Sequence, residues 1–229
     1  MKLEIKGLQK TSLIDYSPYT SCVVFLAGCD FRCPFCQNPD LVLNPEKLDT
    51  IKKEDFFEFL KKRKKWLDGA CITGGEPTLY KELPEFIKQI KDLGYKLKLD
   101  TNGNNPDMLK ELVKLADYVA MDIKSSLEKY DESAGVKVDI EKIKKSVEII
   151  KNSGIDWEFR MTVVPALHSQ EDFEKIGKWL KGAKRFFLQQ FSNKICLDKS
   201  FEKITPFSKE DLEEFKVILS KYISKVEAR

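Results

Sequence analysis

The sequence predicts an α/β fold in which parallel strands and helices alternate along a single domain, residues 1–229. Three observations support it: six short β-rich runs recur, segments with helical periodicity separate them, and no Ser/Gly/Pro-rich linker interrupts the order. Such an order implies a parallel sheet covered by helices, either open and doubly wound or closed toward a barrel. Eight units need about 250 residues. At 229 residues, a barrel here would be a partial (β/α)6 TIM-like one.

The expected strands are short runs rich in β-branched and aromatic residues. They cover 22–27, 70–73, 95–101, 118–124, 157–164 and 185–191. In parallel α/β folds the loops that follow the carboxyl ends of strands form the active site. Chemical motifs in this chain are therefore expected directly after these runs.

The expected helices show apolar residues at helical spacing and recognisable first turns. Three such faces are Phe56, Phe59, Leu60 and Leu67; Ile140, Ile143, Val147 and Ile150; and Leu212, Phe215, Leu219 and Tyr222. Pro84 and Pro106 stand where a first helical turn would begin. Ser169 with Asp172, and Ser208 with Asp211, read as capping boxes. The basic run 61–65 reads as the solvated face of a helix.

Composition and charge exclude several classes of protein. Hydrophobic residues make up 42% and charged residues 34%, which suits a globular chain and excludes a collagenous one. Lys and Arg number 40 against 37 Asp and Glu, a net charge of +3, so no strong nucleic-acid or membrane field is implied. The longest apolar run, 23–27, is far shorter than a membrane span. No signal peptide is visible, so the expected location is the cytoplasm.

Three of the six cysteines crowd together after the first expected strand. Cys29, Cys33 and Cys36 have the spacing C-x3-C-x2-C. Structural zinc takes four ligands, commonly as two pairs, and no second pair follows. An iron–sulfur cube held by three thiolates would instead leave one iron open to a ligand. A structural zinc site completed by another cysteine or by His168 is the alternative.

Two further cysteines and the one histidine are expected to take no part in the chemistry. Cys22 and Cys71 lie in expected strands and read as small core hydrophobes. His168 lies in an expected loop and is predicted to be solvent-exposed rather than catalytic.

Polar motifs follow the later strands. Gly74, Gly75 and Glu76 follow the second strand, and a glycine pair lets the backbone approach a ligand closely. The third strand ends at Asp100, ahead of an Asn102-Gly103 pair that is typical of a turn.

Charged residues also occur within the apolar strands themselves. Asp122 and Lys124 share one face of the fourth strand, and Arg160 lies in the fifth. Such charges are costly unless they pair with each other or with a ligand, so ion pairing and ligand binding both remain open.

The cysteine loop, GCDFRCPFC, resembles the cluster loop of the radical S-adenosylmethionine (SAM) enzymes, with Phe35 before the last cysteine. The resemblance implies that Cys29, Cys33 and Cys36 hold a [4Fe–4S] cluster. It further implies that SAM chelates the open iron, and that one electron cleaves SAM to a 5′-deoxyadenosyl radical.

The same resemblance implies roles for nine further residues. Phe35 packs near the adenine, and Gly74, Gly75 and Glu76 bind the SAM amino group. Asp100 and Asp122 contribute to a monovalent cation site. Lys124 and Arg160 contact the SAM carboxylate. Gln190, at the end of the sixth strand, could hydrogen-bond the adenosine.

The segments GLQKTSLIDY, FLAGCDFRCPFCQNPDL and TGGEPTL resemble the activating proteins of anaerobic ribonucleoside-triphosphate reductase and of pyruvate formate-lyase. That resemblance implies a glycyl-radical enzyme as protein substrate and a low-potential electron donor of the flavodoxin or ferredoxin type. One departure is Gln37, since such activases usually carry histidine after the last cysteine. A radical SAM enzyme for a small molecule or RNA, like 7-carboxy-7-deazaguanine synthase, and a non-catalytic zinc or iron–sulfur module are the alternatives.

Overall fold

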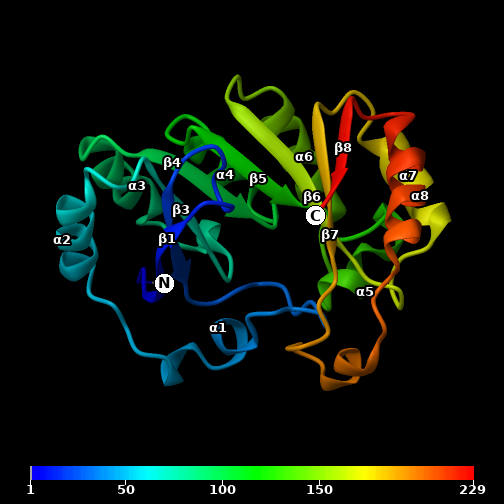
Figure 1. The fold of residues 1–229 in the computed structure, drawn as a ribbon, viewed down its shortest axis with the longest axis horizontal. Helices are drawn as coiled ribbons and strands as arrows, with labels where there is room; N and C mark the ends of the chain where they lie inside the picture. Colours follow the sequence, from blue (N-terminus) through cyan, green and yellow to red (C-terminus); the bar gives the residue numbers. More distant parts are fainter. Residues whose placement is uncertain (1) are drawn as a thin grey trace. The chain divides into compact units, whose positions relative to one another are not determined.

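The computed structural model describes residues 2–229, in which strands and helices alternate along the chain (Figure 1). The strands are β1 (Ile5–Ser12), β2 (Ser21–Leu26), β3 (Gly69–Gly74), β4 (Lys96–Thr101), β5 (Tyr118–Asp122), β6 (Asp156–Val163), β7 (Arg185–Gln190) and β8 (Lys225–Ala228). The α-helices are α1 (Pro39–Leu43), α2 (Lys53–Arg63), α3 (Leu83–Asp92), α4 (Pro106–Leu112), α5 (Tyr130–Ala134), α6 (Ile140–Lys151), α7 (Gln170–Trp179) and α8 (Lys209–Ser220).

Strand order in the sheet follows chain order, from β1 to β8. A doubly wound sheet instead reverses its strand order at a switch point, whereas a (β/α) barrel adds each strand beside the previous one. The observed order therefore supports the barrel-type topology over the doubly wound one. None of the helices in the described residues has the length and apolarity needed to span a membrane.

The six expected strands are confirmed as β2 to β7, and two more occur at the ends of the chain. β1 pairs antiparallel with β2, and β8 pairs parallel with β7. Neither strand was predicted from the sequence, and each has a physical reason. β1 is largely polar and contains Gly7, and β8 has only four residues, of which Val226 is buried.

The chain divides into two compact units. The first comprises Met1–Asp30, Asp40–Ala120 and Lys142–Asp156, and the second comprises Phe31–Pro39, Met121–Glu141 and Trp157–Arg229. In the first unit, β2 pairs in parallel with β3, and β3 with β4. The middle residues of β3 and β4 are buried, as in strands covered on both faces. Cys22 and Cys71 are fully buried there, as predicted.

In the second unit, β7 pairs in parallel with β6 and β8, and α7 and α8 pack together beside β8 (Figure 1). Phe173 and Phe215 join the two helices through stacked rings 4.1 Å apart. The predicted capping boxes, Ser169 with Asp172 and Ser208 with Asp211, are confirmed at the starts of α7 and α8. These helices therefore begin where the sequence indicates.

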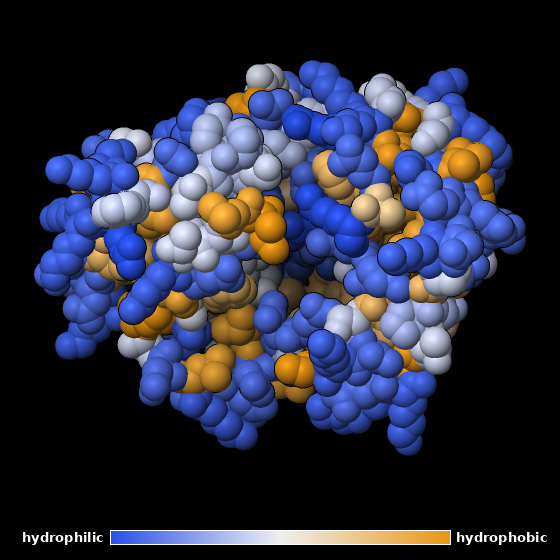
Figure 2. All heavy atoms as spheres, viewed as in Figure 1, coloured by the Kyte–Doolittle hydropathy of each residue, from blue (hydrophilic) through white to orange (hydrophobic). Residues whose placement is uncertain are grey.

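The basic run 61–65 lies mainly exposed at the end of α2, which confirms that it is a solvated face. Charged and polar side chains cover most of the face seen in Figure 2, and apolar side chains appear there in small groups.

Candidate functional site

The cysteine loop connects the two units, with Cys29 in the first and Cys33 and Cys36 in the second. Cys33 is buried, and Cys29 and Cys36 are partly exposed. None of the six cysteines is in a disulfide. Within the described residues, no three His, Cys, Asp or Glu side chains converge as a metal site. By donor chemistry, three thiols on one short loop fit the ligand set of an iron–sulfur cluster.

In the first unit, the Gly74-Gly75-Glu76 segment binds the backbone just before Cys29. Gly75 N donates to Leu26 O (2.9 Å), and Glu76 N donates to Gly28 O (2.8 Å). A Cβ on Gly75 would lie 1.8 Å from Gly28 O. The backbone of the glycine pair thus approaches the chain's own cysteine loop closely, and its contact with a ligand stays a prediction. The glycine pair positions the start of that loop.

Glu76 is almost completely buried and accepts four hydrogen bonds from the same unit. Its Oε1 accepts from Thr78 N (3.0 Å), Thr78 Oγ1 (2.6 Å) and Thr101 Oγ1 (2.8 Å), and its Oε2 accepts from Asn102 N (2.6 Å). Burial raises the pKa of Glu76 to about 7, although the hydrogen bonds from Thr78 and Asn102 oppose the rise. The carboxyl group thereby ties β3 to the loop after β4.

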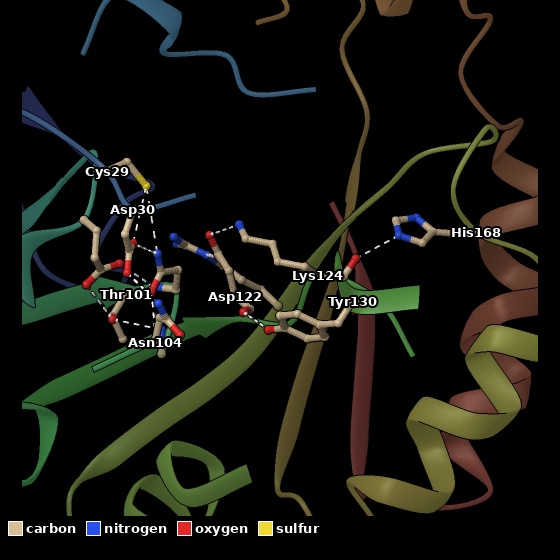
Figure 3. A network of polar contacts seen from close by, with 12 residues as sticks. Cys29, Asp30, Thr101, Asn104, Asp122, Lys124, Tyr130 and His168 are labelled. Atoms are coloured by element: carbon tan, nitrogen blue, oxygen red, sulfur yellow. Dashed lines mark hydrogen bonds and ion pairs between the residues drawn. The ribbon is translucent and has the colours of Figure 1, made fainter. Parts of the chain in front are cut away.

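Beyond Glu76, three polar residues form a closed ring of hydrogen bonds through their side chains and the backbone N–H of Asn104; Asp30 and Asn104 are labelled in Figure 3. Asn102 Nδ2 donates to Asp30 Oδ1 (2.7 Å), Asn104 Nδ2 donates to Asp30 Oδ2 (2.7 Å), and Asn104 N donates to Asn102 Oδ1 (2.9 Å). Asn102 Nδ2 also lies 3.9 Å from Cys29 Sγ. Sequence reasoning missed Asp30 and Asn104, and read Asn102 only as a turn residue.

Asp100, at the end of β4, is buried beside a cation of its own unit. Lys98 Nζ lies 3.3 Å from Asp100 Oδ1 and donates to the backbone oxygen of Asp15 at 2.6 Å. Lys98 stands two residues before Asp100 on the same face of β4. That spacing matches the Asp122–Lys124 pair, and it was the available signal for this ion pair.

In the second unit, Asp122 joins two cations. Lys124 Nζ donates to Asp122 Oδ2 at 3.0 Å, and Arg160 Nε donates to Asp122 Oδ1. Burial alone would raise the pKa of Asp122, but the charges of Arg160 and Lys124 outweigh it and hold that pKa below its usual range. The pKa of Lys124 is raised because the Asp122 charge outweighs burial. The predicted residues thus meet as one carboxylate with two cations, a set that keeps a net positive charge.

The second half of the cysteine loop is anchored within the same unit. Arg32 N donates to Ala134 O at the end of α5 (2.8 Å), and Asp198 N donates to Pro34 O (2.9 Å). Gly135 has φ +68, and a Cβ there would lie 2.1 Å from Arg32 O. Burial raises the pKa of the Cys33 thiol to about 11, and the nearby Lys124 charge opposes this. Lys124 therefore lies close to both Asp122 and Cys33.

His168 is not exposed: it retains only 4% of its accessible surface, so that prediction is wrong. Its Nδ1 accepts from Val164 N (2.9 Å), and its Nε2 lies 2.8 Å from Lys124 O. The first contact leaves the proton on Nε2, which donates to the Lys124 carbonyl. Burial lowers the pKa of His168 to about 4. A loop position proved compatible with burial because two backbone groups satisfy the ring.

Phe35 and Gln190 occupy different environments in the second unit. Phe35 is buried at 6% exposure, whereas Gln190 is exposed at the end of β7. Gln190 Nε2 donates to Phe207 O (2.7 Å). Its amide nitrogen is therefore engaged by the chain itself.

A family model described as the radical SAM superfamily matches residues 23–180. A Methanocaldococcus jannaschii protein named as a glycyl-radical enzyme activating enzyme is 36% identical over 239 residues, covering 100% of this chain and 97% of that protein. The pyruvate formate-lyase-activating enzyme of Clostridium pasteurianum is 29% identical, over 77% of this chain and 76% of the enzyme. The 7-carboxy-7-deazaguanine synthase of Thermococcus kodakarensis is 26% identical, over 72% of each.

Among solved structures, Streptococcus suis SuiB bound to S-adenosylmethionine matches with a TM-score of 0.68 at 18% identity. The match covers 88% of this chain and 48% of SuiB. At this identity the likeness establishes the fold alone. It confirms the predicted α/β class and its partial-barrel type.

Proposed function

We propose that this chain, which belongs to the radical SAM superfamily, activates a glycyl-radical enzyme by removing a hydrogen atom from one of its backbone glycines. The family's cofactors are a [4Fe–4S] cluster and SAM. Identity of 36% over the full chain with a protein named as such an activating enzyme carries the proposal. We treat residues 1–229 as one radical SAM domain, because the family match covers parts of both units.

When bound, the cluster and SAM would supply the radical chemistry: with one electron from a low-potential donor of the flavodoxin or ferredoxin type, SAM would be cleaved and would take up the hydrogen atom removed from the glycine α-carbon. The chain's own residues would hold and orient the cluster and SAM and shield them from water. Cys29, Cys33 and Cys36 would hold three irons through their thiolates.

The cationic set of the second unit suits the SAM carboxylate. Lys124 and Arg160 lie only 14% and 13% exposed, and Asp122 orients both. Two cations against one carboxylate leave a positive charge for an anionic group, and guanidinium and ammonium groups bind carboxylates by charge-assisted hydrogen bonds. Lys124 also lies near Cys33, so a carboxylate bound there would be next to the cluster loop.

The remaining implied residues take supporting positions in this proposal. Gly74, Gly75 and Glu76 would present backbone and carboxyl oxygens to the SAM amino group, and Phe35 would pack near the adenine. Both oxygens of Asp122 already accept from Lys124 and Arg160, so the monovalent cation that the resemblance implies at Asp100 and Asp122 would have to displace one of them. Asp100 already pairs with Lys98, and Gln190 Nε2 donates to Phe207 O. Both oxygens of Glu76 also accept hydrogen bonds within the chain, so these three sets of contacts would have to exchange on binding.

Electron paramagnetic resonance tests the activase proposal. The reconstituted, reduced chain is mixed under anaerobic conditions with SAM and an anaerobic ribonucleotide reductase or a pyruvate formate-lyase. The expected result is the doublet of a glycyl radical with matching 5′-deoxyadenosine. Cys33→Ala should abolish both.

The 26% identity to 7-carboxy-7-deazaguanine synthase supports a second candidate function, radical chemistry on a small molecule. The same mixture separates the two. Release of 5′-deoxyadenosine without a doublet from any glycyl-radical enzyme, together with turnover of a small-molecule substrate, would contradict the activase proposal.

A further inference from the structure

The ring of Asp30, Asn102 and Asn104 uses both oxygens of one carboxylate. Each Asp30 oxygen accepts from a different asparagine at 2.7 Å, and a 2.9 Å hydrogen bond between the two asparagines closes the ring. Each member restricts the other two, so Asp30 cannot rotate without breaking two hydrogen bonds. The ring lies entirely within the first unit.

The ring is anchored to buried structure on the side of Asn102. Asn102 is 5% exposed, and its backbone N–H is held by Glu76 Oε2 at 2.6 Å. The next residue, Gly103, has φ +78, and its carbonyl oxygen accepts from Ser146 Oγ at 2.6 Å. The amide of Asn102 is therefore fixed by its backbone as well as by Asp30.

Cys29 is the immediate neighbour of this fixed group. Its Sγ lies 3.9 Å from Asn102 Nδ2 and 4.0 Å from Asp30 Oδ1 (Figure 3). One sulfur thus faces an amide N–H and a carboxylate oxygen together. Hydrogen bonds and charges next to a ligating sulfur are the usual means by which a protein sets a cluster's reduction potential.

We propose that Asp30, held by Asn102 and Asn104, is a positioning residue that keeps the Asn102 amide beside Cys29 Sγ, and that its charge lowers the reduction potential of the cluster which Cys29 helps to hold. This inference rests on the proposed function, because it requires the cluster. A negative charge beside the sulfur disfavours adding an electron, whereas an N–H donated to sulfur favours it. The amide nitrogen and the carboxylate oxygen lie at nearly equal distances from the sulfur, 3.9 Å and 4.0 Å, so the full charge of Asp30 outweighs the dipole of the Asn102 amide.

A redox titration of the reconstituted full chain, followed by the EPR signal of the reduced cluster, tests this. Asp30→Asn removes the charge and keeps the side-chain size, and it should shift the midpoint to a less negative potential. Asp40→Asn is the matched control: it makes the same change at an exposed position of the next helix and should leave the midpoint at the parent value. A midpoint in Asp30→Asn equal to that of parent and control would overturn the proposal.

If Asp30→Asn takes up no cluster, a second variant tests the positioning role of Asp30. Asn104→Ala keeps the charge but removes one of the two ties on Asp30, so iron release to a chelator should quicken several-fold at a nearly unchanged midpoint. Unchanged release would overturn the positioning role. Failure of the parent chain itself to hold iron would instead contradict the proposed function. A parent that holds a normal cluster with no response in either variant contradicts only this inference.

Discussion

The Nε of Arg160 donates a hydrogen bond to Oδ1 of Asp122, which holds a guanidinium on β6 beside a carboxylate at the end of β5. Because Lys124 occupies the other carboxylate oxygen, the three side chains form one network rather than two separate pairs. Asp122 orients both cations and neutralises only one of them. An anion of suitable shape can therefore bind without first displacing a full countercharge.

We expect Arg160→Ala and Lys124→Ala to weaken SAM binding to the reconstituted chain by about 10- to 100-fold each, because a hydrogen bond to a charged group is worth about 1.5–3 kcal/mol. Equilibrium dialysis with labelled SAM measures the change. Lys129→Ala is the control, since this lysine of the same unit pairs with Asp172 instead. Equal affinity in all three variants would show that the SAM carboxylate binds elsewhere.

Gly75→Ala should destabilise the chain strongly, by about 3 kcal/mol or more, because overpacking against fixed backbone is among the costly kinds of substitution. The added Cβ would meet the Gly28 carbonyl oxygen at 1.8 Å. Urea unfolding of the iron-free chain measures the loss. Gly154→Ala provides the comparison, since a Cβ there meets nothing within 4 Å and only its φ of +77 is strained. A cost there of about 1–2 kcal/mol is expected. Similar losses in both variants would count against the packing role of Gly75.

The strand and helix pattern was predictable because it depends on residues close together in the sequence. The six central strands, the two capping boxes and the burial of Cys22 and Cys71 all follow from local alternation or short spacing. β1 and β8 were not predicted, because a polar edge strand and a four-residue strand carry little periodic signal.

The site was predictable only in part, for a related reason. Spacing indicated the cysteine loop and the Asp122–Lys124 pair, which are local features. The ring of Asp30 with Asn102 and Asn104 joins residues more than 70 positions apart. The burial of His168 depends on the Lys124 carbonyl, 44 positions away. Neither contact leaves a periodic trace in the sequence, and an aspartate after the first cysteine was the only hint of the ring.

Glu76 predicts a pH dependence of stability of unusual sign. Its folded pKa, about 7, lies above the unfolded value, so the folded chain holds a proton that the unfolded chain has lost. The contribution of Glu76 to the free energy of unfolding is fully present below about pH 4.3. It declines as the pH rises to about 7, by at most about 1.4 kcal/mol per pH unit. Glu76→Gln should flatten this decline. Urea unfolding of the iron-free chain at pH 5, 6, 7 and 8 measures it, and parallel profiles for parent and variant would exclude the assignment.

For His168 we expect the opposite: its contribution to the free energy of unfolding rises with pH, over a pH range that overlaps with that of Glu76. Its folded pKa of about 4 lies below the unfolded value of about 6.5, so its contribution is full above pH 6.5 and is lost as the pH falls toward 4. The charged groups that act on the ring are Asp172 and Lys129, and neither offsets its burial. His168→Phe should remove this slope, whereas Glu76→Gln should leave it in place.

The same variant tests the structural role of the imidazole at pH 7.5. His168→Phe leaves the Val164 N–H and the Lys124 carbonyl without their partner, and each buried group left unsatisfied costs about 1–3 kcal/mol. His168→Gln, whose amide can both accept and donate, should recover part of that loss. A phenylalanine variant as stable as the parent at pH 7.5 would mean that the ring does not link the β6–α7 loop to the backbone of Lys124. The position of the Lys124 side chain beside Asp122 would then depend on Asp122 and Arg160 alone.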